Sequence, residues 1–169
     1  MTHRLILTRH AKSSWQDPTA DDHDRPLNKR GRAAAIDIGE WLAQHDFIPD
    51  LVLCSTSART RETWDIMSKA LPRQGELRLE AALYHATPEQ MLAVLRKVTD
   101  AQTVLLLGHN PGMAQAAAAL AANPPHHPRF AQYPTTATTV YQFDISGWDK
   151  VSWGSGDVLA FTLPRDEVA

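Results

Sequence analysis

The chain contains a single cysteine, Cys54, among its 169 residues. One thiol cannot form an internal disulfide and cannot build a thiolate metal cluster, so both are excluded. The sequence also has no apolar run long enough to span a membrane, and its first ten residues, MTHRLILTRH, lack the pattern of a signal peptide. We therefore expect a cytoplasmic protein that does not insert into membranes.

A strong charge excess of either sign is absent as well. Seventeen Lys and Arg residues against nineteen Asp and Glu residues give a formal net charge of -2. Proteins that bind nucleic acid or an anionic membrane normally carry a basic excess, so neither partner is expected. A chain of this length buries roughly 70% of the surface that its unfolded form exposes. It therefore needs no covalent staples to fold, and we expect residues 1–169 to form one domain.

Apolar runs typical of strands alternate along the chain with segments that have the apolar spacing of helices. Strands are expected at residues 4–8, 51–54, 77–79, 103–107, 138–144 and 158–163. Helices are expected at residues 27–45, 58–71, 88–98 and 113–122, and a proline-rich loop at residues 123–136. The first helix has Asn28 or Asp24 as its starting residue. This alternation predicts an α/β fold, a three-layer α/β/α sandwich whose central sheet is mostly parallel, with antiparallel pairing toward the end of the chain.

Three clusters of polar and charged residues stand directly behind predicted strands. They are Arg9-His10, Ser55 with Arg59-Thr60, and Gly108-His109-Asn110. Ligands of open α/β sheets bind outside the carboxyl ends of the strands, so we expect the three clusters to converge. Two arginines and two histidines in one crevice indicate a site for a dianionic oxyanion, most simply a phosphoryl group, because the planar guanidinium binds phosphate oxygens in pairs. Helix N-termini behind the second and third clusters would add backbone N–H donors.

These clusters carry a resemblance to a known family. The segment LTRHAKS at residues 7–13 resembles the Arg-His-Gly signature of the histidine phosphatase superfamily, which has the phosphoglycerate mutase-like fold. The Ser55, Arg59-Thr60 and Thr63 pattern and the Gly108-His109-Asn110 turn match that family's second and third motifs in order and spacing. The short chain and the run Arg25-Pro26-Leu27 with Arg30-Gly31 resemble the phosphohistidine phosphatase SixA group most closely. The resemblance extends from Leu5 to about Met113.

The resemblance implies a mechanism in which His10 is the nucleophile. It would attack phosphorus and form a phosphohistidine enzyme that water then hydrolyses. A nucleophilic histidine must be neutral, and the unperturbed pKa of roughly 6.5 allows this at pH 7. Arg9, Arg59 and His109 would hold the equatorial oxygens and supply the positive charge that a metal supplies in other phosphoryl-transfer enzymes, so no metal or cofactor is expected. Ser55, Asn110, Glu80 and His85 are the expected substrate-binding residues.

Two positions depart from the family pattern. Ala11 stands where the signature has glycine, which would strain the backbone if that position needed a positive φ. Mutase-type members place a glutamate three residues before a Tyr-Gly pair, whereas Ala81 precedes Tyr84 here and Glu80 lies one step away. Without this general acid, substrates with good leaving groups are favoured, because an alkoxide needs a donated proton. A phosphohistidine loses a readily protonated imidazole, so a phosphorylated protein is the expected substrate. Asp21, Asp22 and Asp24 are alternative proton donors.

Cys54 does not fit the Cys-x5-Arg loop of cysteine phosphatases. Four residues separate it from Arg59 and six separate it from Arg61, so we interpret Cys54 as a buried strand residue. The remaining histidines are expected on the surface or in loops, with His85 bordering the site. Two further functions stay open: a phosphatase of small phosphomonoesters such as sugar or nucleotide phosphates, and a phosphate-binding module without catalysis.

Overall fold

The computed structural model describes residues 2–165 and contains six strands and four α-helices. The strands are β1 (Thr2–Arg9), β2 (Leu51–Ser55), β3 (Glu76–Glu80), β4 (Thr103–Gly108), β5 (Thr138–Asp144) and β6 (Asp157–Thr162). The helices are α1 (Lys29–Gln44), α2 (Ala58–Ser68), α3 (Pro88–Arg96) and α4 (Gly112–Leu120). Three short 3-10 turns are η1 (Asp22–Asp24), η2 (Ala81–Leu83) and η3 (Trp148–Lys150). No helix within residues 2–165 is long and apolar enough to cross a membrane.

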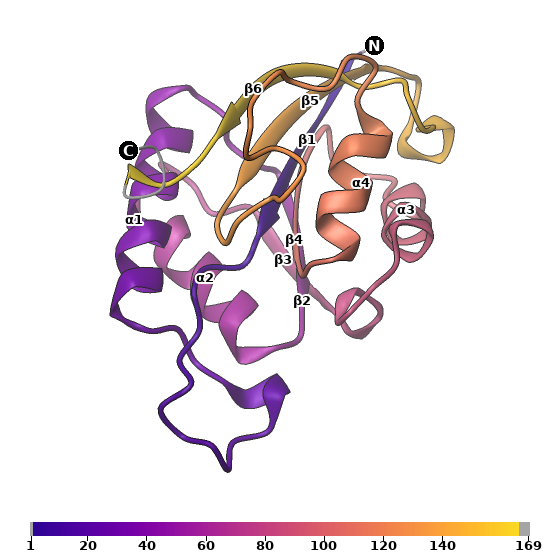
Figure 1. The fold of residues 1–169 in the computed structure, drawn as a ribbon. Coiled ribbons are helices and arrows are strands. Elements are labelled where there is room, and N and C mark those ends of the chain that lie inside the picture. The colour runs from indigo at the N-terminus through magenta and orange to yellow at the C-terminus, as the bar shows by residue number, and fades with distance from the viewer. Residues whose placement is uncertain (1, 166–169) are drawn as a thin grey trace.

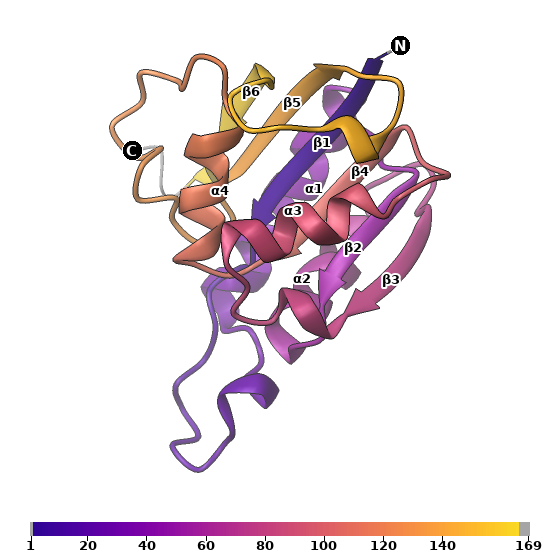
Figure 2. The same cartoon turned by 90° about the vertical axis from the view of Figure 1, so that its right-hand side faces the viewer.

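The strands form one sheet in the order β3-β2-β4-β1-β5-β6. The first four strands of this order run parallel, β5 is antiparallel to β1, and β6 is antiparallel to β5. Figures 1 and 2 show α1 and α2 on one face of the sheet and α3 and α4 on the other. The predicted three-layer α/β/α sandwich with a mostly parallel sheet is therefore confirmed, including the antiparallel pairing at the end of the chain.

Alternation along the strands divides the core between the two faces. In β1, Ile6 packs with the apolar residues of α1 and α2, whereas Leu5 and Leu7 pack with those of α3 and α4. These three side chains are fully buried or nearly so. Because both faces of the parallel strands are covered, the strands read in the sequence as continuous apolar runs. The sheet is thereby held rigidly, and its carboxyl edge becomes the platform for the polar clusters.

Some helices begin or end at other residues than predicted, and capping side chains set their first residues. The first helix begins at Lys29 because the side chain of Asn28 accepts a hydrogen bond from the backbone N–H of Gly31 at 2.8 Å. Asp24, the alternative start, belongs instead to η1. The helix α3 begins at Pro88 as expected, and Thr87 caps it. The second helix ends at Ser68, three residues before its predicted end.

Residues 12–28 form a long loop whose two ends are joined to each other, and we refer to it as the 12–28 loop. Ser13 and Leu27 pair as an isolated antiparallel bridge, and the backbone N–H of Asn28 donates to the carbonyl of Lys12 at 3.0 Å. Figure 1 shows the loop projecting below the sheet, at the carboxyl edge of the parallel strands. The first turn of α1 packs directly on it, because a Cβ atom at Gly31 would lie 2.1 Å from the carbonyl oxygen of Lys12.

This close approach predicts that Gly31→Ala destabilises the protein. Helix propensity alone favours alanine over glycine by up to about 1 kcal/mol. Overlap with the Lys12 backbone instead forces the loop or the helix to shift, which we expect to cost about 1–3 kcal/mol of unfolding free energy. Urea denaturation of the wild type and the variant shows whether the free energy of unfolding falls or rises. Ala33→Gly, at an exposed position of the same helix, is the matched control and should cost about 1 kcal/mol through propensity. A more stable Gly31→Ala protein would contradict the contact.

Candidate active site

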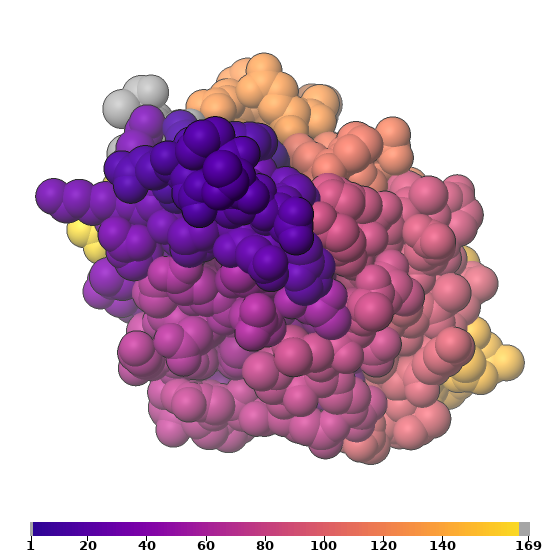
Figure 3. Space-filling model, turned by 90° about the horizontal axis from the view of Figure 1, so that it is seen from below, coloured from indigo at the N-terminus to yellow at the C-terminus, as the bar shows by residue number. Residues whose placement is uncertain are grey.

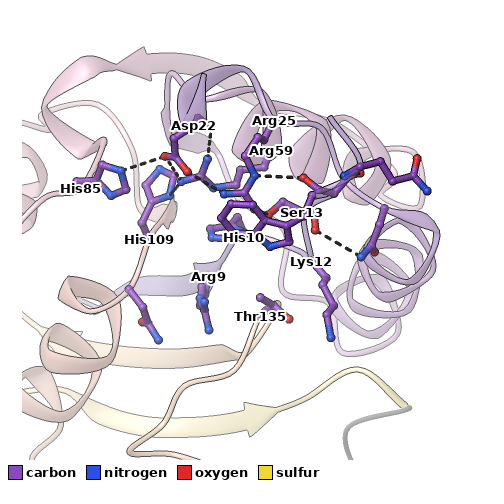
Figure 4. A pocket seen from close by; sticks show the side chains of 15 residues that line it. Arg9, His10, Lys12, Ser13, Asp22, Arg25, Arg59, His85, His109 and Thr135 are labelled. Carbon is purple, nitrogen blue, oxygen red and sulfur yellow. Dashed lines mark hydrogen bonds and ion pairs between the residues drawn. The ribbon is translucent and has the colours of Figure 1, made fainter. Parts of the chain in front are cut away.

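A cleft of about 570 Å³ opens at the carboxyl edge of the parallel strands. Figure 3 looks onto this edge, where the indigo segment near the N-terminus lies beside the magenta and orange segments that follow in the chain. Figure 4 shows side chains from several elements pointing into the cleft. Its lining residues are Arg9, His10, Lys12, Ser13, Ser14, Trp15, Gln16, Asp22, Arg25, Asn28, Arg59, His85, His109, Asn110 and Thr135. The three polar clusters of the sequence therefore do converge on one site.

The side chain of His10 follows the last residue of β1 and is nearly completely buried. Its Nδ1 atom lies 2.6 Å from the carbonyl oxygen of Ala11. A carbonyl oxygen only accepts, so Nδ1 carries the proton and Nε2 keeps a free lone pair. Burial lowers the pKa of His10 to about 3, and the guanidinium groups of Arg9, Arg59 and Arg25 act in the same direction. His10 is therefore a neutral imidazole at pH 7 with a nucleophilic nitrogen available.

His109, which directly follows β4, stands next to His10 with ring centroids 5.2 Å apart. Arg59 Nη2 donates to its Nδ1 at 3.2 Å, so the other nitrogen, Nε2, carries the proton and donates to the Ser55 hydroxyl at 2.8 Å. Burial lowers the pKa of His109 to about 2, with further contributions from His10 and Arg59. Ser55 thus orients His109 from behind the cleft.

Arg9 enters the cleft from the end of β1. Its Nη1 donates to the carbonyl oxygen of Tyr133 at 3.2 Å, whereas its buried Nε has no hydrogen-bond partner among residues 2–165. Burial, followed by the charge of Arg59, lowers the pKa of Arg9. Thr136, held at a φ of 66°, donates its backbone N–H to the carbonyls of Arg9 and His10 and so fastens the chain segment beneath them. An unpaired guanidinium N–H at this place is suited to bind an anion.

The carboxylate of Asp22 is the centre of the polar network at the cleft mouth. It accepts hydrogen bonds from Arg25 at 2.8 Å, Arg59 at 3.0 Å, the Tyr84 hydroxyl at 2.6 Å and His85 at 3.2 Å. Hydrogen bonding from Tyr84, and then from Arg59, lowers the pKa of Asp22 well below its usual range, while desolvation opposes them. Asp22 is therefore an ionised acceptor that fastens the 12–28 loop over the cleft (Figure 4).

The structure places most of the predicted site residues in the cleft, but not all. Ser55 lies behind His109 rather than on the cleft surface. Asn110 lines the cleft, and its side chain is bound to the backbone of Gln132, Tyr133 and Ala114, which gives it a role in holding loops together. Glu80 ends β3 and is not among the lining residues, because the η2 turn behind it brings His85 into the cleft instead.

Several residues of the site were not predicted. Among the three aspartates considered as donors, only Asp22 lines the cleft. Arg25 belongs to a sequence motif that predicts no site role for it, although its guanidinium reaches Asp22. The sequence pattern predicts no site role for Lys12 or Trp15 either. The positive charges at residues 9, 12, 25 and 59 were a detectable signal, but the sequence alone does not show which of them face one another.

One departure from the family pattern, the alanine at position 11, is accommodated by its surroundings. Ala11 is fully buried and is not among the residues with positive φ, so alanine carries no left-handed strain there. Its backbone N–H donates to the Thr63 hydroxyl, which in turn donates to the carbonyl of Arg59 at 2.6 Å. Cys54 is a buried strand residue, as interpreted, and burial raises its pKa to about 12. Within residues 2–165, no group of three or more His, Cys, Asp or Glu side chains is arranged to hold a metal ion.

Comparison with known proteins agrees with this geometry. A family model for the histidine phosphatase superfamily (branch 1) matches residues 5–84. An uncharacterised protein of Mycobacterium tuberculosis is 34% identical over 164 residues, which cover 93% of this chain and 99% of that protein. The chain belongs to the histidine phosphatase superfamily. This confirms the resemblance carried by the three sequence motifs, and it indicates a protein that acts on phosphorylated substrates.

Two further proteins are similar to this chain. An uncharacterised chloroplastic protein of Arabidopsis thaliana is 36% identical over 130 residues, and this chain spans 60% of its length. A solved structure from Nakamurella multipartitia, described as a candidate phosphohistidine phosphatase SixA, superimposes with a TM-score of 0.81 at 27% identity and covers 98% of each chain. The SixA-like architecture therefore extends over the described chain, beyond the matched motifs.

The lowered pKa values of His10 and His109 predict that neither ring titrates between pH 5 and pH 8. Burial keeps both rings neutral in the folded protein, whereas in the unfolded chain they take up protons as the pH falls below roughly 6.5. Their contribution to stability is thus present above that pH and declines as the pH falls toward 3. Two-dimensional NMR of the imidazole resonances measures this directly, with free histidine in the same buffer as the reference.

Assignment of the two rings comes from His10→Gln and His109→Gln, each of which should remove one non-titrating resonance. A titration midpoint near 6.5 at either ring would contradict the burial argument.

Proposed function

We propose that this protein is a metal-independent phosphatase that works through a phosphohistidine intermediate on His10 and dephosphorylates phosphohistidine in a protein. The observation that carries the proposal is the state of His10. Its proton is held on Nδ1 by the Ala11 carbonyl, and its free Nε2 lies in a cleft lined by three arginines, Arg9, Arg25 and Arg59. A neutral nucleophile surrounded by fixed positive charge suits attack on a phosphoryl dianion.

In the first step, the Nε2 lone pair of His10 forms a bond to phosphorus while the bond from phosphorus to the leaving nitrogen breaks. The free ring nitrogen of the substrate's phosphohistidine takes up a proton from solvent beforehand, so the imidazole keeps the electron pair of the broken bond and leaves neutral. In the second step, water attacks phosphorus, the bond to Nε2 breaks, its electron pair returns to His10, and the water protons remain on the inorganic phosphate or pass to solvent. The proton of His10 stays on Nδ1, hydrogen-bonded to the Ala11 carbonyl, so one tautomer serves both steps.

Positive charge for both steps comes from side chains already aimed into the cleft. Arg9 lines the cleft and would donate guanidinium N–H groups to a phosphoryl oxygen. Arg59 binds Asp22 in the ligand-free protein, and a phosphoryl dianion would compete with that carboxylate for the same guanidinium. His109 becomes a second donor when a bound dianion favours its protonated form. Preorganised donors of this kind stabilise the transition state without the cost of reorienting water.

We propose a substrate with a nitrogen–phosphorus bond because of the acidic side chains that line the cleft. Asp22 is the only carboxylate among the lining residues within the described chain, and its lowered pKa makes it an acceptor rather than a proton donor. An alkoxide leaving group requires a donated proton, whereas an imidazole is readily protonated. The cleft therefore favours a phosphohistidine over an alkyl phosphate.

A second candidate, a phosphatase of small phosphomonoesters, is favoured by one observation. His85 Nε2 lies 3.2 Å from the Asp22 carboxylate, and its side chain is half exposed at the cleft mouth. A histidine paired with a carboxylate can donate a proton to a departing oxygen. This donor would act instead of Glu80, which lies one residue from the family's acid position in the sequence.

The proposed nucleophile is tested by measuring phosphate release from a phosphohistidine protein and from para-nitrophenyl phosphate, with EDTA present. Wild-type protein should hydrolyse the phosphohistidine protein, and His10→Ala should fall to the buffer background because the N–P bond can no longer form. Acid-labile, base-stable phosphate should be trapped on the wild type alone. His126→Ala, an exposed histidine outside the cleft, is the matched control and should keep full activity.

Four results would revise the proposal. Activity that survives in His10→Ala removes the nucleophile, and loss of activity in EDTA removes metal independence. Hydrolysis confined to para-nitrophenyl phosphate keeps the mechanism and moves the substrate to small esters. Phosphate binding without turnover on either substrate would leave a phosphate-binding module.

The two candidates are separated by a pair of variants at neighbouring positions. If His85 donates the proton, His85→Gln lowers kcat on an alkyl phosphate by about a hundredfold, because a general acid contributes at least that much. The same variant should hardly change kcat on phosphoramidate, whose nitrogen leaves without help. Glu80→Gln, outside the cleft, should change neither rate. A loss on the alkyl phosphate in Glu80→Gln would restore Glu80 as the acid and refute its placement.

A further inference from the structure

The indole of Trp15 lines the cleft and is unusually exposed for a large apolar side chain. It is 77% exposed, more than any other large hydrophobic side chain of the described chain, yet it lines the same cleft as His10. By contrast His10, Arg59 and His109 are each at most 6% exposed. The cleft thus has a buried, charged floor and an aromatic side chain at its open rim. An aromatic side chain placed at the mouth of a polar site is a common contact for the non-reacting part of a ligand.

Trp15 is exposed but not free to move. The guanidinium carbon of Arg25 lies 3.2 Å from the ring centroid, so one face of the indole is covered by a cation. Arg25 is itself fixed, because its Nε donates to the Ser14 carbonyl, its Nη1 to Asp22 and its Nη2 to the Ser13 hydroxyl. The guanidinium is only 7% exposed in the folded protein. The indole is therefore held in place before any ligand arrives, which reduces the entropy lost on binding.

The ring of Trp15 lies on the side of the cleft toward which a leaving group would point. A phosphoryl group attacked by His10 has its leaving group on the opposite side of phosphorus, because nucleophile and leaving group are in line. With the nucleophile on the buried floor, the leaving group points toward the open rim where Trp15 stands. The indole presents a flat apolar surface, and Arg25 covers one face of it. A planar ring fits this surface best.

We infer that Trp15 determines substrate specificity by contacting the planar ring of the leaving group, the imidazole of a phosphohistidine side chain. This inference rests on the proposed function and names the part of the substrate that the cleft recognises besides phosphate. The electron-rich indole also attracts the imidazolium form of the phosphohistidine, which exists once its free ring nitrogen is protonated and before the bond to phosphorus breaks, because cations bind the faces of aromatic rings. The contact is made to the leaving group alone, so it does not involve the phosphoryl oxygens.

The test compares two substrates that share a nitrogen–phosphorus bond and differ in the ring: phosphoramidate and a phosphohistidine peptide. In Trp15→Ala, we expect kcat/KM on the peptide to fall roughly tenfold, as for the loss of one aromatic contact. On phosphoramidate it should stay within twofold of the wild type. Trp15→Phe should recover most of the peptide activity, and Trp153→Ala, an exposed tryptophan outside this cleft, should leave both values unchanged.

Equal losses on both substrates in Trp15→Ala would overturn the inference, because they would show that the indole only holds the 12–28 loop. Unchanged activity on both would overturn it as well. Failure of the proposed function is distinguished by a binding measurement that needs no turnover. Calorimetry with a non-hydrolysable phosphotriazolylalanine peptide should show roughly tenfold weaker binding to Trp15→Ala, with orthophosphate binding unchanged. Equal affinity of both proteins for that peptide would refute the role of Trp15 whatever the enzyme hydrolyses.

Discussion

The site depends on one electrostatic balance, in which several guanidinium groups are gathered around an imidazole that has to stay neutral. Arg9, Arg25 and Arg59 all lower the pKa of His10, in addition to the larger effect of burial. The same cations repel one another: burial lowers the pKa of Arg9, and the charge of Arg59 lowers it further. Asp22 relieves this repulsion by accepting hydrogen bonds from Arg25 and Arg59. The neutral state of His10, the positive charge that lines the cleft and the position of the 12–28 loop are therefore set by one group of charges.

The sheet brings these groups together through register rather than through long side chains. Arg9 is paired with Gly108 at the ends of adjacent parallel strands, so the residues that follow, His10 and His109, emerge side by side. The hydroxyl of Thr63 ties the first turns of α2 to the end of β1, which fixes Arg59 relative to the nucleophile. Placement by neighbouring strand ends keeps the geometry rigid, and a rigid site is what preorganised charge stabilisation requires.

How much of this arrangement the sequence predicts depends on whether each residue is placed by a local pattern or by contacts with distant parts of the chain. His10 and His109 could be assigned because they follow apolar runs that are recognisable as buried strands. The 12–28 loop has no such pattern, and its shape depends on a distant contact with Gly31 and on pairing between its ends. Asp22 is equivalent in sequence to its neighbours, and only the η1 turn brings it rather than them to Arg59. Glu80 seemed close to the acid position, but the turn after β3 favours His85.

Two independent features of the cleft favour a substrate with a nitrogen–phosphorus bond. The first is the acid–base chemistry of its lining: Asp22, the only carboxylate lining the described cleft, is an ionised acceptor, so a leaving group that is itself readily protonated is favoured. The second is the rim, where a fixed indole offers a flat surface to whatever leaves. An alkyl alcohol satisfies neither requirement, and a phenol satisfies only the second, because its ester oxygen is not basic enough to take up a proton before it leaves. An imidazole satisfies both, since it is planar and its free ring nitrogen is protonated before the bond to phosphorus breaks. The acid–base properties of Asp22 and the placement of Trp15 thus support the proposed substrate class for separate physical reasons.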